Sequence, residues 1–499
     1  MKKHILILLS LLIFSLGCTK SNQNRNLDTR NQNKTWPNPP KKSIDLNFVK
    51  KNPIILERAD TFCTPDKALE DIGKTKVWLF KKNKLVLTEV NLTGVSGKDL
   101  SSIVSSGAYY NFKYVVDYKE CSSRGNSNYH CKLSTTFVEQ EGKAVSICRA
   151  GGGYPAKSIE NAALAGMSGL MQAYKTIKAS SQEINLPKVE LLIHPFFESR
   201  INTEQESLVT FMTDNAFWTN ASRTGKGFSI ALLPHSEQFK KVFDKAPLWA
   251  QSGVVSHEYG HHVFHYLAPN LFASAQSMSL SQQIGQNFEN VLETLSAKAF
   301  GKENRTITTK QVVSSLNEGY ADLIAHYSHD SGNNPWGSVV IGLFQKARNT
   351  KSCNCDDGEV KSINNSVIKH FFSPHTSRPH TYFAVDHQDV HSVGAIIAHG
   401  IDDLLSNQQK ESGSELSSIE KMNWLINWAN RLNKDFEQRH AYTPPDLLQE
   451  FMYHGISYLD ELHAPFTLEQ CKTINRVFPV YIDHWKSSKE NFSCEKSSQ

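Results

Sequence analysis

One short stretch constrains this chain more than any other: a His-Glu-x-x-His run inside the apolar segment 254–265. His257 and His261 are four residues apart, so a helix through them presents both imidazoles on one face. Two histidines with this spacing can share one small cation, and Glu258 can reach a water at that cation without being a ligand. The stretch predicts a helix that carries part of a metal site. A solvated helix with two histidines one turn apart is the alternative.

A second helical run supplies a candidate for the third metal ligand. The amphipathic pattern from Thr309 to His329 places Glu318 and Asp322 on one face, again four residues apart. One carboxylate can bind a metal, while the other can accept the outer N–H of a ligand histidine. We therefore predict that Glu318 completes the metal group and that Asp322 supports a ligand histidine. The alternative is a surface helix that carries two carboxylates.

The sequence also predicts the bounds of the metal-binding helix and the roles of its other histidines. We expect it to begin near Pro247 and to run past His265. His262 and His265 are predicted to be structural, because a ligand stripe three turns long would not curve around one metal. The long segment before the second helical run is expected to contain a further helix at 280–300.

Two more motifs flank these helices. Upstream, Asn215 to Trp218 reads Asn-Ala-Phe-Trp in a strand-like run. Downstream, Asp386 and His391 precede a helical pattern from Gly394 onward. An aromatic core strand and a histidine at a helix N-terminus are the simpler interpretations of these motifs. All four segments follow one another between about residues 156 and 405.

In this order the four segments resemble the gluzincin metallopeptidases, between their thermolysin-like and fungalysin-like groups. The resemblance implies an α+β fold with two lobes, a β-rich upstream lobe and a helical C-terminal lobe, and the metal-binding helix between them. It also implies a zinc-dependent endopeptidase that holds one Zn²⁺ and cuts extended polypeptides. Glu258 would then be the general base.

The resemblance also implies roles for the flanking motifs. The main chain at Asn215 and Ala216 would bind the substrate backbone by strand addition. His391 would stabilise the oxyanion, oriented by Asp386 in the thermolysin-like pattern or by Asp389 in the fungalysin-like one.

The chain departs from the family pattern in two places. No tyrosine matches the one that helps to stabilise the transition state. His329 stands where an acidic calcium ligand would be expected, so we expect no calcium site. The alternative function is a catalytically inactive zinc-binding surface lipoprotein of the same fold. The intact Glu258 argues against this alternative, because metal binding alone does not need that carboxylate.

The N-terminus has the pattern of a targeting segment. Two lysines precede an apolar run from Ile5 to Leu16 that is too short to span a bilayer. Ser15–Cys18 resembles a bacterial lipobox, so residues 1–17 are predicted to be a signal peptide and Cys18 to be lipidated. Thr19 follows the cysteine, which favours the outer membrane of the cell envelope. Ordinary secretion is the alternative.

Composition changes mark the expected domains. Residues 18–45 are polar and contain proline, which predicts a disordered tether after the lipid anchor. Residues 46–150 contain short alternating runs typical of β-strands, and residues 151–499 form the expected catalytic region. The β-rich region could instead be a pro-region that covers the cleft until it is cut.

Overall composition fits a folded protein with an ample core, since 39% of the 499 residues are hydrophobic and 21% are charged. The net charge is +5, and the lysines and arginines are dispersed rather than clustered. This pattern does not indicate a nucleic-acid partner.

Eight cysteines remain when Cys18 is set aside, an even number that favours disulfides in an exported chain. Cys121 and Cys131 flank a turn-rich segment and could join the strands of a hairpin. Cys353 and Cys355 are predicted to be structural, with different partners. The sequence does not determine the pairing.

Overall fold

Helices and strands are mixed along the chain in this computed structural model, as the changing periodicity of the sequence predicts. The structure describes residues 63, 65–81, 84–102, 109–115, 139–140, 144–202, 207–211, 215–219, 228–234, 247–272, 309–329, 394, 398, 401–402, 405–406 and 415–439. The expected signal peptide and tether, the helix expected at 280–300, and residues 386–391 lie outside this description. Of the helices described, none has the length and apolar character needed to cross a membrane.

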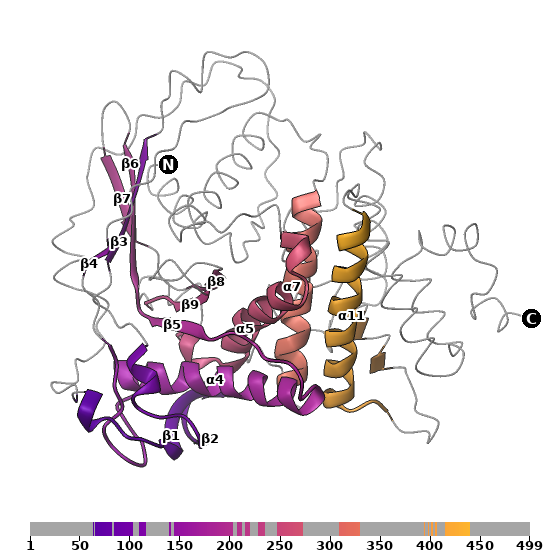
Figure 1. Ribbon diagram of the computed structural model, residues 1–499. Coiled ribbons are helices and arrows are strands. Elements are labelled where there is room, and N and C mark those ends of the chain that lie inside the picture. The colour runs from indigo at the N-terminus through magenta and orange to yellow at the C-terminus, as the bar shows by residue number, and fades with distance from the viewer. Residues whose placement is uncertain are drawn as a thin grey trace, which may run out of the picture.

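The helices expected from Pro247 past His265 and from Thr309 to His329 are present, with one long helix before them and one after them in the sequence (Figure 1). They are α4 (Ile159–Ser180), α5 (Ser252–Leu267), α7 (Thr309–Ser328) and α11 (Ser418–Arg439). Single turns of 3-10 helix occur at η2 (Pro65–Lys67), η3 (Asp99–Ser102), η5 (Leu248–Ala250) and η6 (Pro269–Phe272). The strands are β1 (Gly73–Lys81), β2 (Lys84–Leu92), β3 (Tyr109–Val115), β4 (Glu139–Gln140), β5 (Val189–Ile193), β6 (Phe196–Asn202), β7 (Ser207–Phe211), β8 (Ala216–Thr219) and β9 (Phe228–Leu232).

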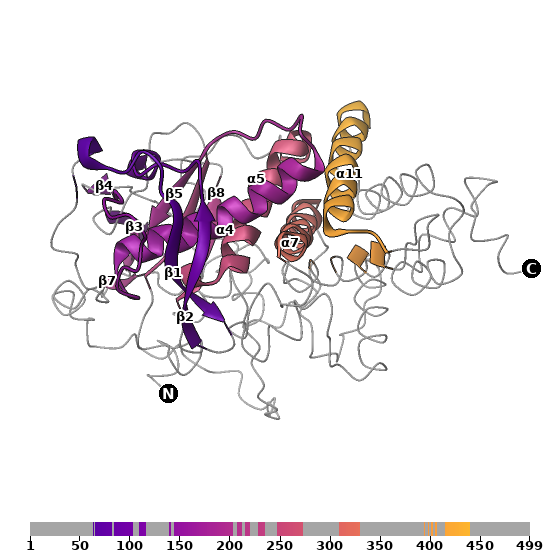
Figure 2. The same ribbon diagram turned by 90° about the horizontal axis from the view of Figure 1, so that it is seen from below.

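The antiparallel pair β1–β2 packs on α4, the long helix that begins after the three glycines at 151–153 (Figure 2). Ser158 caps this helix, because its Oγ accepts a hydrogen bond from the backbone N–H of Asn161 at 3.2 Å. The fully buried Asn161 side chain reaches the strand. Its Oδ1 accepts from the N–H of Trp78 at 2.8 Å, and its Nδ2 donates to the Trp78 carbonyl at 3.5 Å. Asn161 thus satisfies main-chain groups of β1 as a neighbouring strand would.

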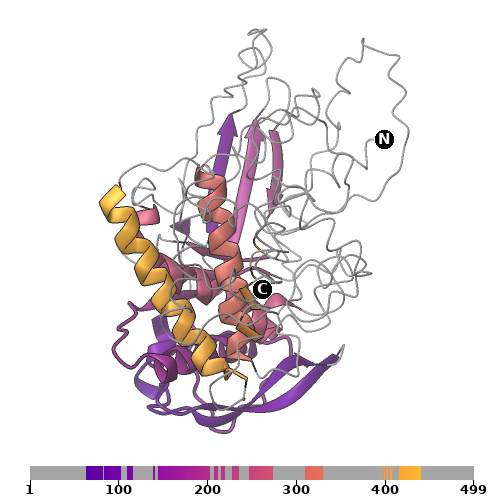
Figure 3. The same ribbon diagram turned by 90° about the vertical axis from the view of Figure 1, so that its right-hand side faces the viewer.

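Two further sheets join segments that are distant in the sequence. One has the strand order β4-β3-β6-β7, in which β3 and β6 run parallel, and Figure 3 shows these strands extending away from the helices. This sheet contains residues from both sides of the domain boundary expected near residue 150. A disulfide between Cys63 and Cys148 adds another link within the upstream region, with a Cα–Cα distance of 5.8 Å. The other sheet has the order β5-β9-β8.

The helices pack on one another through one hydrophobic core, in which α5 contacts both α4 and α7, and α11 lies beside α7 (Figure 1). The expected metal-binding helix begins after Pro247 with the η5 turn and continues as α5. Glycine permits its closest contact with α7, because a Cβ on Gly260 would lie 2.6 Å from Cα of Ala321. The backbones of α5 and α7 therefore approach closely at Gly260, which lies next to His261 in the metal motif.

Candidate metal centre

Three predicted ligands from two helices meet at the crossing of α5 and α7. His257 Nε2 lies 3.4 Å from Oε2 of Glu318, and His261 Nε2 lies 3.7 Å from the other oxygen, Oε1. The two imidazole centroids are 4.5 Å apart, and the rings are nearly perpendicular at 82°. One ligand atom from each of the three residues lies within 4.8 Å of the other two. This His-His-Glu group can hold a metal ion.

Asp322 lies directly behind the first histidine, one turn beyond Glu318 on α7. Its Oδ1 is 2.8 Å from Nδ1 of His257, and its side chain is completely buried. A carboxylate oxygen only accepts, so in the neutral imidazole this contact favours the tautomer with its proton on Nδ1. Nε2 of His257 then keeps its lone pair on the side that faces Glu318. The structure therefore brings Asp322 to the position in which it can orient a metal ligand.

Glu258 is the buried residue that follows the first histidine on α5, with 7% of its surface exposed. Both His257 and His261 are buried as well, at 3% and 7% exposure. A metal bound by this group would therefore be largely screened from bulk solvent, and Glu258 belongs to the same helical turn as its ligands. Glu258 is a buried carboxyl on the metal-binding helix and is not a member of the His-His-Glu group.

The other histidines of α5 make packing contacts outside the metal group. His262 Nε2 is 3.0 Å from the carbonyl oxygen of Pro187, to which it can donate. Burial lowers the pKa of His262 to about 4, despite an opposing contribution from that hydrogen bond. His265 stacks on Phe272, with centroids 4.7 Å apart, and burial also lowers its pKa to about 4. These contacts agree with the structural role predicted for both histidines.

The predicted substrate-binding strand runs beside the metal-binding helix. β8 pairs antiparallel with β9, and among the described strands it forms the edge of its sheet. Asn215 precedes it and accepts from the N–H of Leu233 at 2.9 Å through its main-chain oxygen. The Ala216 N–H donates to Oδ1 of Asn215 at 2.9 Å. The ring of Trp218 lies 6.4 Å from that of His261, which places this strand alongside the metal group.

The segment predicted to stabilise an oxyanion lies mostly outside the described residues, including Asp386, Asp389 and His391. Gly394, which follows it, is helical and packs against α7. A Cβ on Gly394 would lie 2.6 Å from Cβ of Glu318 and 2.8 Å from the backbone nitrogen of Gly319. The chain downstream of His391 therefore passes directly beside the third metal ligand.

A further contact behind the metal group was not foreseen from the sequence. Ser256 Oγ donates to the carbonyl of Gly169 at 3.0 Å and lies 3.0 Å from Nε2 of His329. Since the hydroxyl has one proton, His329 must supply the N–H of the second bond. The contact joins α4, α5 and the end of α7 next to His257. The sequence singled out His329 only because an acidic residue was expected there. It could not reveal the contact, because Ser256 and Gly169 belong to other helices.

Comparison with known proteins adds no relative. A scan against profiles of known protein families finds no match for the chain, and a search of the curated proteins finds none either. The function proposed below therefore rests on the residues of the site.

Proposed function

We propose that this chain is a zinc-dependent endopeptidase whose metal ligands are His257, His261 and Glu318. The observation that carries the proposal is the buried carboxylate of Glu258 on the same helical turn as a His-His-Glu group. A metal-storage or purely structural site does not require a carboxylate there. Catalytic zinc sites combine three protein ligands with one open position, which suits this set.

The ligand distances support zinc as the metal. Donor atoms about 2.1 Å from a tetrahedral ion lie about 3.4 Å apart. The two nitrogen–oxygen distances are 3.4 and 3.7 Å to different oxygens of Glu318, and one donor atom from each residue lies within 4.8 Å of the others. The contact with Asp322 favours the tautomer of His257 whose lone pair faces the group. Two imidazoles and one carboxylate also form a donor set typical of hydrolytic zinc sites.

In the proposed reaction, water adds to the scissile carbonyl carbon and the C–N bond then breaks. Zn²⁺ held by His257, His261 and Glu318 would supply the Lewis acidity that polarises that carbonyl and would lower the pKa of a bound water toward ~7. Glu258 removes one proton from the attacking water and later delivers it to the departing amine nitrogen. Glu258 therefore returns to its carboxylate form at the end of the cycle, and one water is consumed for each bond cut.

His391 is proposed to donate to the oxyanion that develops on the carbonyl oxygen. Three peptide units separate it from Gly394, so their Cα atoms lie within about 11 Å of each other in any conformation. Gly394 itself packs at Glu318, and this contact supports the proposal. One such donor is worth on the order of 3 kcal/mol. Asp386 or Asp389 would orient the ring.

The proposed substrate is an extended polypeptide that pairs with β8. Main-chain groups of an edge strand bind any extended peptide, so this mode provides affinity without selecting a sequence. The partly buried Trp218 belongs to β8, and its ring lies beside that of His261, where it would flank the bound chain. Ala216 is the proposed main-chain contact, and the peptide would displace the Asn215 side chain from its N–H. The main-chain carbonyl of Asn215 already accepts from Leu233, so Asn215 would contribute its side chain instead.

The test combines metal analysis with cleavage of casein by the full-length chain. Glu258→Gln keeps the side-chain shape, so it should retain one zinc per chain and lose activity by about 100 to 10,000-fold. Glu160→Gln is the matched control, because Glu160 is also a buried glutamate but belongs to α4. This control should keep both zinc and activity.

Two results would overturn the proposal. Zinc bound by the wild-type chain without any peptide cleavage would indicate an inactive metal-binding protein instead. Full activity in Glu258→Gln would exclude this residue as the general base.

A further inference from the structure

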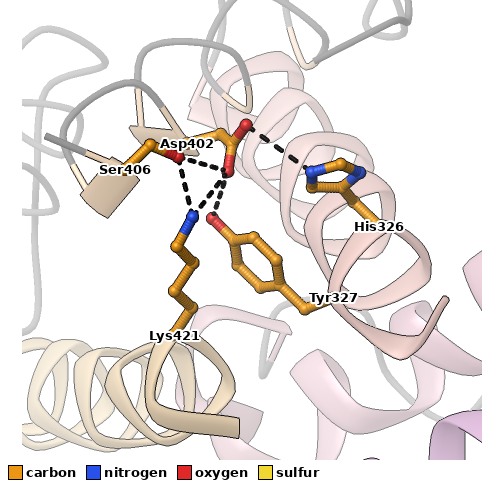
Figure 4. A network of polar contacts seen from close by, with 5 residues as sticks. All are labelled: His326, Tyr327, Asp402, Ser406 and Lys421. Atoms are coloured by element: carbon orange, nitrogen blue, oxygen red, sulfur yellow. Dashed lines mark hydrogen bonds and ion pairs between the residues drawn. The ribbon is translucent and has the colours of Figure 1, made fainter. Parts of the chain in front are cut away.

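A second buried polar group lies on α7, two helical turns beyond Glu318 (Figure 4). We call it the Asp402 cluster; its members are His326, Tyr327, Asp402, Ser406 and Lys421. Oδ1 of Asp402 accepts from Tyr327 Oη at 3.0 Å and from Ser406 Oγ at 3.4 Å. The Lys421 ammonium lies 3.7 Å from the same oxygen, and Nε2 of His326 lies 3.6 Å from Oδ2. The cluster therefore surrounds one carboxylate with donors.

The cluster connects three separate elements. His326 and Tyr327 belong to α7, Lys421 belongs to α11, and Asp402 lies in a helical segment between them in the sequence. Asp402 is 2% exposed and Lys421 8%. Removing one partner of such a buried pair leaves an uncompensated charge, which is strongly destabilising. The three elements are thus held in one relative position.

The segment with Asp402 runs parallel to α7 along the metal-bearing part of that helix. Its described residues, at positions 394, 398, 401, 402, 405 and 406, are all helical. Gly394 packs beside Glu318, and Asp402 packs beside His326. Glu318 and His326 are eight residues apart on α7, which is about 12 Å at 1.5 Å per residue. Gly394 and Asp402 are also eight residues apart, so the two contacts follow one another in the same direction along both segments.

The two ends contribute differently to this packing. At the Gly394 end, the missing side chains of Gly394 and Gly319 allow a close approach that rests on van der Waals packing. At the other end, the Asp402 cluster has directional hydrogen bonds and paired charges. A shift of about 1 Å at the glycine end would change the packing against Cβ of Glu318. The polar end must therefore set the axial position of the pair.

We propose that Asp402 is a positioning residue for the metal centre. By joining the 394–406 segment to α7 and α11, it keeps Gly394 packed against Glu318. The Glu318 carboxylate is then held where it meets both His257 and His261. The inference rests on the zinc site of the proposed function, but it does not depend on the peptidase activity.

The test is a double-mutant cycle read by zinc affinity, measured by chelator competition on the full-length chain. Asp402→Asn keeps the shape but removes the charge that Lys421 requires. It should weaken zinc binding about 10-fold, the lower range for residues that support a ligand. Glu318→Ala removes the ligand through which Asp402 acts. Adding Asp402→Asn to Glu318→Ala should therefore change the remaining affinity by less than about twofold.

Additional measurements separate positioning from a general loss of stability. The absorption spectrum of the Co²⁺-loaded chain reports the ligand geometry and should change in Asp402→Asn. Asn161→Ala provides the control, because it loses buried hydrogen bonds on α4 and should lower stability without altering that spectrum. Lys421→Met in the Asp402→Asn chain removes the uncompensated cation and should restore zinc affinity at least in part. If Asp402→Asn does not fold, Tyr327→Phe removes one donor and replaces it in the cycle.

The outcomes are separable from those of the proposed function. Wild-type zinc affinity and Co²⁺ spectrum in a folded Asp402→Asn or Tyr327→Phe chain would overturn the inference. Equal losses in the wild-type and Glu318→Ala backgrounds would overturn it too. Absence of casein cleavage would contradict the proposed peptidase activity, but it would not change the interpretation of the zinc affinities.

Discussion

Replacing Gly260 by alanine should damage the metal centre through the spacing of its two helices. The added Cβ would lie 2.6 Å from Cα and 3.1 Å from Cβ of Ala321. Carbon atoms rest about 3.5–4.0 Å apart, so α5 and α7 must separate by about 1 Å. His257 and His261 would move with α5, away from Glu318 on α7. Metal sites tolerate ligand displacements of about 0.2 Å, so this shift is several times too large.

Gly260→Ala should therefore weaken zinc binding at least about 10-fold and lower the free energy of unfolding by about 1–3 kcal/mol. Chelator competition measures the first quantity, and urea unfolding of the metal-free chain measures the second. Gly169→Ala is the matched control, because its Cβ would lie 2.8 Å from Cβ of Val255, at the contact of α5 with α4. It should cost similar stability but leave zinc affinity close to wild type. Equal affinity losses in the two variants, or none in Gly260→Ala, would refute the spacing argument.

Two further predictions concern pH and the upstream region. Burial lowers the pKa of His265 to about 4. An unfolded histidine has a pKa near ~6.5, so the unfolded chain binds more protons between these values and stability falls as pH drops from ~6.5 toward 4. His265→Phe keeps the stacked ring and should remove about 1–2 kcal/mol of the stability difference between pH 7 and pH 5, measured by urea unfolding. If that difference is unchanged, the lowered pKa of His265 is not its cause. Peptide mapping without reductant should recover Cys63 linked to Cys148, and replacing both by serine should cost about 2–4 kcal/mol of stability. Recovery of either cysteine with a different partner would contradict the pairing.

Patterns within one helix were predictable from the sequence, because 3.6 residues per turn determine which side chains share a face. His257 and His261 lie together on α5 for this reason. Glu318 and Asp322 lie together on α7 for the same reason. The position of α7 followed from its amphipathic pattern.

Contacts between elements were decided only by the tertiary structure. Spacing along the chain does not show that α5 and α7 cross at Gly260 and bring Glu318 to the histidines. It does not reveal the Ser256–His329 contact or the Asp402 cluster, whose members come from different helices. Eight cysteines allow many pairings, and only folding brings Cys63 to Cys148. Such contacts depend on the packing free energy of the whole core, whereas helical spacing depends on local covalent geometry alone.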